Sequence, residues 1–295
     1  MDAFLVTGFT TVVVYVSLAT LLHLQYGKAG IVNFGVVGFV GIGMYSFGVL
    51  TVTHQVPFLL ALLIATLLTG LVAFGLGLLI LDLDAESVLV ATLAFATIVF
   101  HLVTTEKWLT NGVVGLGTIP FPFDFGRDTR FYLMLLLTFF AALIVFYAYR
   151  VGVSPYGRLL FAIQDNEPLA KGLGKPTTRQ KLVFFTVTSA AMGFIGAWYA
   201  SATQFLVPQI IGASLTFTVW IALIIGGRKR VLGGALGVIV TVALFDIFVE
   251  RYAELPPDYA QQLPNLKLML YGLVLMLVIL FRPVGLLGER RVDRP

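Results

Sequence analysis

Apolar residues along the chain fall into long runs that short polar segments separate. Each run covers roughly 17–24 residues, enough for a helix to cross a hydrocarbon layer about 30 Å thick. The alternating strands of about 10 residues that are typical of an outer-membrane barrel are absent. The pattern predicts about nine spans, at residues 3–24, 30–53, 57–80, 87–106, 131–149, 182–203, 211–227, 232–250 and 266–282.

Composition supports a membrane location. Hydrophobic residues make up 59% of the chain and charged residues 12%, with a mean hydropathy of +0.97, whereas about a quarter of the residues of a soluble domain are charged. No linker interrupts the pattern, so we expect residues 1–295 to form a single all-α transmembrane bundle. The N-terminal stretch has no basic region or small-residue cleavage site, which favours a retained helix over a signal peptide.

Basic residues predict the orientation. Most of the 19 Lys and Arg lie in the C-terminal tail and in the connecting segments that the order of spans places on the same side of the membrane as that tail. Because Lys and Arg concentrate in cytoplasmic loops, we expect a cytoplasmic C-terminus and, from the odd number of spans, an N-terminus outside. The protein is therefore expected to be a multi-pass protein of the cytoplasmic membrane.

The second predicted span is rich in glycine, with Gly30, Gly35, Gly38, Gly41, Gly43 and Gly48. Glycine lets a neighbouring helix approach closely in lipid, so this span is expected inside the bundle. The glycines fit a helix beside the substrate path and an ordinary packing helix equally well. Polar candidates for the substrate path on the spans are Asn33, Tyr45, Thr92 and Thr97.

The longest basic connection, residues 150–181, is predicted to hold two short helices. Ser154-Pro155 is typical of a helix start. Pro168 fits the first turn of a second helix, which Asn166 or Glu167 would cap. Gly172 and Gly174 are natural stops. We therefore expect an ordered cytoplasmic hairpin, although an ordinary solvated loop is the simpler alternative.

Several stretches resemble the permeases of branched-chain amino acid ABC transporters, in the LivM branch. They are "QYGKAGIVNFG", "GIGMYSFGVL", "TLAFATI", "LTNGVVGLGTIP", "SPYGRLLFAIQDNEPLAKGLG" with "KLVFFTVTSAAMGFIGAWYA", and "LYGLVLMLVILFRPVGLLG". They follow the order of that family over nearly the whole chain.

The resemblance implies a permease subunit that pairs with a second, related permease within the membrane lipid. Two ATP-binding cassette ATPases would dock on the cytoplasmic side, and an extracytoplasmic solute-binding protein would deliver substrate. No nucleic acid or cofactor is implied. The family's coupling helix maps onto Asp165, Asn166, Glu167, Leu169, Ala170, Gly172, Leu173 and Gly174.

Branched-chain amino acids are the first expected substrate, and urea or short amides the second. A secondary transporter or channel would usually carry charged groups at mid-membrane, and these are scarce here. An enzyme is not expected, because the three histidines are scattered and no zinc-protease or serine-hydrolase motif occurs. The chain also has no phosphate-binding loop, so ATP hydrolysis would belong to a partner.

Overall fold

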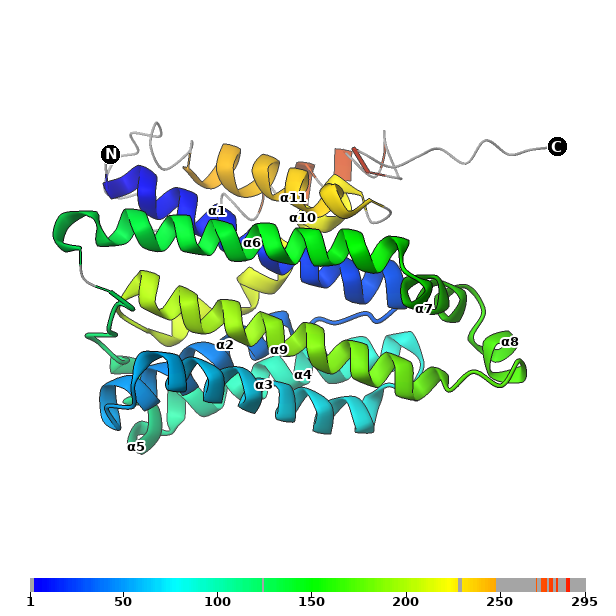
Figure 1. Cartoon of the computed structure of the whole chain (residues 1–295), viewed down its shortest axis with the longest axis horizontal. Coiled ribbons are helices and arrows are strands. Elements are labelled where there is room, and N and C mark those ends of the chain that lie inside the picture. Colours follow the sequence, from blue (N-terminus) through cyan, green and yellow to red (C-terminus); the bar gives the residue numbers. More distant parts are fainter. Residues whose placement is uncertain are drawn as a thin grey trace.

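The computed structural model describes residues 3–123, 125–227 and 230–247, and positions 269, 272–274, 276–277, 280 and 285–286. The long helices of these parts lie side by side in one bundle (Figure 1). Seven of them are long and apolar enough to cross a membrane. Most of the predicted span at 266–282, and the end of the one at 232–250, lie outside the described residues.

The described helices match the predicted spans closely, and they confirm the all-α class without fixing the total number of spans. The short helices are α5 (Lys107–Thr110), η3 (Gly112–Val114), η4 (Gly126–Asp128), α7 (Pro155–Asp165) and α8 (Glu167–Gly172). The long ones are α1 (Ala3–Leu22) continuing into η1 (His23–Lys28), α2 (Val36–Gly48) continuing into η2 (Val49–Thr53), α3 (Phe58–Ile80), α4 (Ala85–Thr105), α6 (Thr129–Val153), α9 (Thr177–Thr203), α10 (Ala213–Gly226) after η5 (Pro208–Ile211), and α11 (Val231–Val238) continuing into η6 (Ile239–Ile247).

The second predicted span starts later than expected. Residues 30–35 are not helical, and α2 begins only at Val36. Gly30 has a φ of 70°, a left-handed conformation that ends the preceding helical turns. The local sequence did not predict this break. The break depends on side chains from other helices, which bond backbone groups that have no partner within a helix.

The glycines of α2 do allow close helix contacts, as predicted. A Cβ atom at Gly43 would collide with the backbone carbonyl of Gly193 on α9, and one at Gly38 would meet the ring of Phe95 on α4. Small residues are what bring helix backbones together in lipid. Helix α2 is therefore a central element of the bundle, between α9 and α4.

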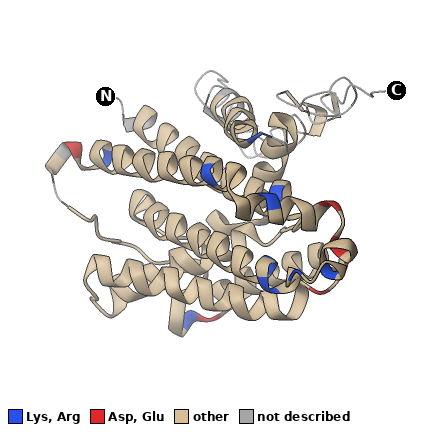
Figure 2. Cartoon of the chain, turned by 45° about the vertical axis from the view of Figure 1, so that its right-hand side comes forward, with Lys and Arg blue, Asp and Glu red and all other residues tan. Residues whose placement is uncertain are grey.

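The connections alternate between two ends of the bundle, as the predicted topology requires. At one end, Thr178 donates a hydrogen bond to Asp82 at 2.7 Å, which joins the start of α9 to the α3–α4 connection. Helices α7 and α8 lie at this end (Figure 1). At the opposite end, Leu116 and Leu206 form an antiparallel bridge between the α4–α6 and α9–α10 connections. Most of the Lys and Arg positions coloured in Figure 2 lie toward the end that carries α7 and α8.

Candidate functional site

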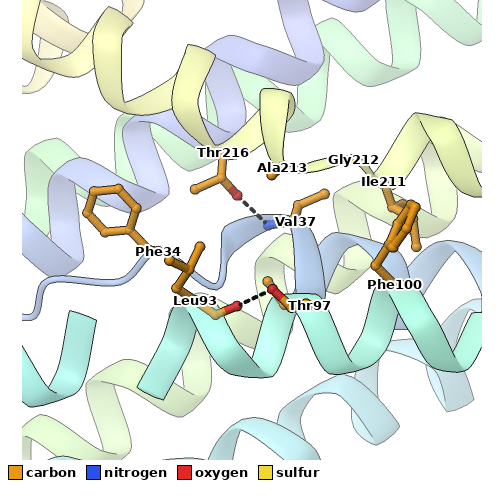
Figure 3. Close-up of a pocket in the computed structure, with 10 residues that line it drawn as sticks. Phe34, Val37, Leu93, Thr97, Phe100, Ile211, Gly212, Ala213 and Thr216 are labelled. Carbon is orange, nitrogen blue, oxygen red and sulfur yellow. Dashed lines mark hydrogen bonds between the residues drawn. The ribbon is translucent and has the colours of Figure 1, made fainter. Parts of the chain in front are cut away.

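A small cavity lies where the non-helical segment before α2 meets α4 and α10 (Figure 3). Its volume is about 190 Å³. The wall is mostly apolar, and polar groups come from two threonines. The lining residues are Phe34, Val37, Leu93, Ala96, Thr97, Phe100, Ile211, Gly212, Ala213 and Thr216.

A buried hydrogen-bond network holds the segment beside this cavity. The Gln25 amide N–H donates to Thr188 at 2.8 Å and to Ser189 at 3.1 Å, both on α9. The Asn33 side-chain amide donates to Gln25 Oε1 at 2.7 Å, and the Trp220 indole N–H donates to the Asn33 carbonyl at 3.0 Å. Since Gln25 and Asn33 are fully buried, these bonds satisfy polar groups that water cannot reach.

The four predicted path residues have different positions. Asn33 accepts a hydrogen bond from the Gly35 N–H at 2.7 Å, and buried Thr92 accepts one from the Phe34 N–H at 2.9 Å, so both support the wall from behind. Tyr45 is buried on α2 outside the cavity lining. Only Thr97 lines the cavity itself, with its hydroxyl donating to the Leu93 carbonyl at 3.0 Å (Figure 3).

Two helices begin at the cavity. Gly212 and Ala213, at the start of α10, belong to its lining. The Val37 N–H in the first turn of α2 donates to the Thr216 hydroxyl at 3.1 Å (Figure 3). The N–H groups at a helix start carry partial positive charge, which favours a carboxylate nearby. The cavity thus has an apolar wall and adjoins the starts of α2 and α10.

The second part of the candidate site is the hairpin of α7 and α8. The Ser154 hydroxyl accepts a bond from the Gly157 N–H at 3.0 Å, capping α7. The Asn166 side chain accepts one from the Leu169 N–H at 3.0 Å, capping α8. The predicted bend and caps are therefore confirmed, with Asn166 in the capping role. The hairpin is an ordered element rather than a loose loop.

An ionic contact braces α8 against the start of α9. Glu167 accepts from Lys181 at 2.7 Å and from Thr177 at 3.1 Å, and it pairs with Lys171 at 3.2 Å. Partial burial alone would raise the pKa of the Glu167 carboxyl, but the hydrogen bond and charge of Lys181, with hydrogen bonds from Lys171 and Thr177, outweigh it and lower that pKa below its usual range. Glu167 is therefore charged at neutral pH and holds the hairpin to α9.

The remaining predicted coupling residues divide into inward and outward positions. Ala170 is buried. Leu169 and Leu173, one helical turn apart, are 60% and 71% exposed, an unusual degree for leucine outside the membrane. The other outward positions are Asp165, Asn166, Gly172 and Gly174. The hairpin thus presents an apolar pair at its tip, flanked by polar residues.

Sequence reasoning did not single out Gln25, Gln164, Thr216 or Trp220. Gln25 and Asn33 flank Gly30 within one short stretch, and two amide side chains around a glycine in an apolar region indicate a buried polar network. That signal was available in the sequence. The partners on α9 and α10 were not, because they are distant along the chain and are ordinary residues of apolar helices.

Residues 4–279 match the family described as "Branched-chain amino acid transport system / permease component". The chain is 27% identical to the high-affinity branched-chain amino acid transport system permease protein LivM of Salmonella typhimurium, over 96% of this chain and 69% of that protein. It is 23% identical to a probable LivM of Methanocaldococcus jannaschii, over 95% and 92% of the two chains.

A solved structure with a related fold is that titled "PsaBC from Streptococcus pneumoniae in complex with Fab". The TM-score is 0.50 at 14% sequence identity, over 96% of this chain and 93% of that one. This likeness concerns the fold alone. On the match over almost its whole length, the chain belongs to the family of branched-chain amino acid transport permeases, as a multi-pass membrane protein.

Proposed function

We propose that this chain is one permease subunit of an ABC importer that carries branched-chain amino acids, with separate ATPases as its energy source. The observation that carries the proposal is the capped and braced α7–α8 hairpin, which presents exposed Leu169 and Leu173 and is continuous with two long helices. Such an element can receive force from a soluble partner and pass it to the membrane helices.

The chemistry of the cavity lining suits a small amphipathic substrate. Phe34, Val37 and Ile211 supply apolar surface for an aliphatic side chain. The partial positive charge at the start of α10 would favour a carboxylate placed beside it. Urea or a short amide is the second candidate, and it would use the hydroxyls of Thr97 and Thr216 but leave the apolar wall without a partner group.

A second permease is expected to close the cavity. Thr97 and Ala213 line it and are also exposed on the outside of the subunit, so the cavity opens on the face formed by α4 and α10. A polar solute cannot travel along a face that is open to lipid. A related permease packed against this face would complete a path between the two subunits.

The opposite end of the bundle suits a solute-binding protein. The α4–α6 connection carries Trp108 and Val114, which are 81% and 73% exposed. The bridge between Leu116 and Leu206 ties this connection to the one before α10, close to the cavity. A protein that docks there would meet the outer entrance of the path.

A secondary transporter or channel is the alternative from another class. In the described spans, charged residues lie near the helix ends, and ion-coupled transporters usually place such groups at mid-membrane. This arrangement favours transport that separate subunits drive over transport that an ion gradient drives. ATP-independent uptake by the chain alone would support the alternative.

The test is ATP-driven uptake of labelled leucine into vesicles that contain the chain with its permease partner, ATPases and binding protein. Leu169→Asp combined with Leu173→Asp should reduce uptake by about tenfold or more, because docking would then bury two carboxylates without partners. Leu169→Met with Leu173→Met keeps the apolar surface and should retain uptake. Equal uptake by both double variants would refute the docking role.

A further inference from the structure

The hairpin touches the bundle at a second place besides α9. The Gln164 side-chain amide at the end of α7 donates to the Tyr26 carbonyl in η1 at 3.1 Å. A Cβ atom at Gly30 would lie 3.0 Å from Gln164 Cγ. Gln164 therefore lies directly on the turn where the chain leaves η1 and enters the non-helical segment before α2.

That segment leads straight to the cavity. Ile31 N–H bonds to the Gln25 carbonyl at 2.9 Å, and Asn33 is held by Gln25 and Trp220. Residues 30–34 are not helical, so bonds to side chains rather than a helical ladder hold them in place. Phe34, at the end of this segment, is part of the cavity wall.

We propose, resting on the function proposed above, that Gln164 is a positioning residue that fastens the hairpin to residues 26–30, so that hairpin and cavity wall move as one body. Force from the ATPases then reaches the wall through this short route as well as through α6 and α9. The glycine at position 30 is required because a side chain there would push Gln164 away, on top of the strain at its positive φ.

The junction combines a buried contact with an adjoining cavity. Ile163, the neighbour of Gln164, is buried, and Gln164 Oε1 is buried without a hydrogen-bond partner among the described residues. A cavity of about 210 Å³ adjoins the contact, lined in part by Gly30, Leu83 and Glu167. The amide is thus committed to Tyr26 on one side while space remains beside it.

An engineered disulfide tests whether the two parts move together. The chain has no cysteine, and a Cβ at Gly30 would lie 3.5 Å from Gln164 Cβ, within the range of about 3.5–4.5 Å that a disulfide requires. Gly30→Cys with Gln164→Cys should form the bridge on oxidation. Leucine uptake should then be equal to or higher than that of the same protein after reduction. Loss of uptake on oxidation that reduction reverses would overturn the proposal, because the parts must then separate during transport.

The single variants Gly30→Cys and Gln164→Cys control for backbone strain and for oxidation elsewhere. Gln164→Ala gives a test without the strained position. It should lower leucine uptake per ATP hydrolysed by about 2- to 30-fold while the ATPases still co-purify. An unchanged uptake-to-hydrolysis ratio in Gln164→Ala would equally contradict the proposal. Absence of ATP-driven uptake by the unmodified assembly would instead refute the importer function itself.

Discussion

Replacing Gln25 by leucine should destabilise the fold more than its small change in volume suggests. The Gln25 side chain accepts from the Asn33 amide at 2.7 Å and donates to Thr188 and Ser189. After Gln25→Leu, the buried Asn33 N–H has lost this acceptor, at a cost of about 1–3 kcal/mol. Each lost bond to an α9 hydroxyl adds about 0.6 kcal/mol in a membrane protein. The expected loss is about 2–4 kcal/mol in the free energy of unfolding.

The assay is equilibrium unfolding in mixed micelles, with the folded fraction followed as denaturing detergent increases. Gln209→Leu makes the same chemical change at an exposed position and should alter stability by no more than about 0.5 kcal/mol. If Gln25→Leu were as stable as Gln209→Leu, the network would not hold the segment before α2. The reasoning about the cavity wall would then fail as well.

Gly43→Val should sharply lower the yield of folded protein in an expression assay, because a Cβ atom there would collide with the Gly193 carbonyl. Gly75→Val is the control. A Cβ atom at Gly75, on the exposed side of α3, meets no atom within 4 Å, so this variant should fold normally. Glu167→Gln should lower the unfolding temperature at neutral pH, because it removes the charge that pairs with Lys181. The pKa of Glu167 is lowered in the folded protein. The pairing therefore stabilises the fold fully above the ordinary carboxyl pKa of about 4.3, and this stabilisation is lost as the pH falls through the lower pKa of the folded state. The gap between wild type and variant should therefore close as pH is lowered from about 6 to about 3, and a constant gap would count against the brace.

The sequence predicted the helical spans well because long apolar runs leave a chain in lipid few alternatives to a helix. It also predicted the α7 and α8 caps, since Ser154, Asn166 and Pro168 act locally. It did not predict the break at residues 30–35, because the side chains of other helices that bond this backbone come from α4 and α10. For the same reason the sequence, which offered Asn33 and Thr92 as candidates for the substrate path, could not show that both lie outside the cavity lining.

The account depends most on contact between the hairpin and a separate motor. Leu173→Cys in this cysteine-free chain, labelled with a short photo-activated cross-linker, measures that contact during ATP-driven leucine uptake. The account predicts a covalent adduct with an ATPase subunit, and inhibition of uptake that grows with the adduct. Reaction of the cross-linker with lipid or water alone, while uptake continues, would contradict it.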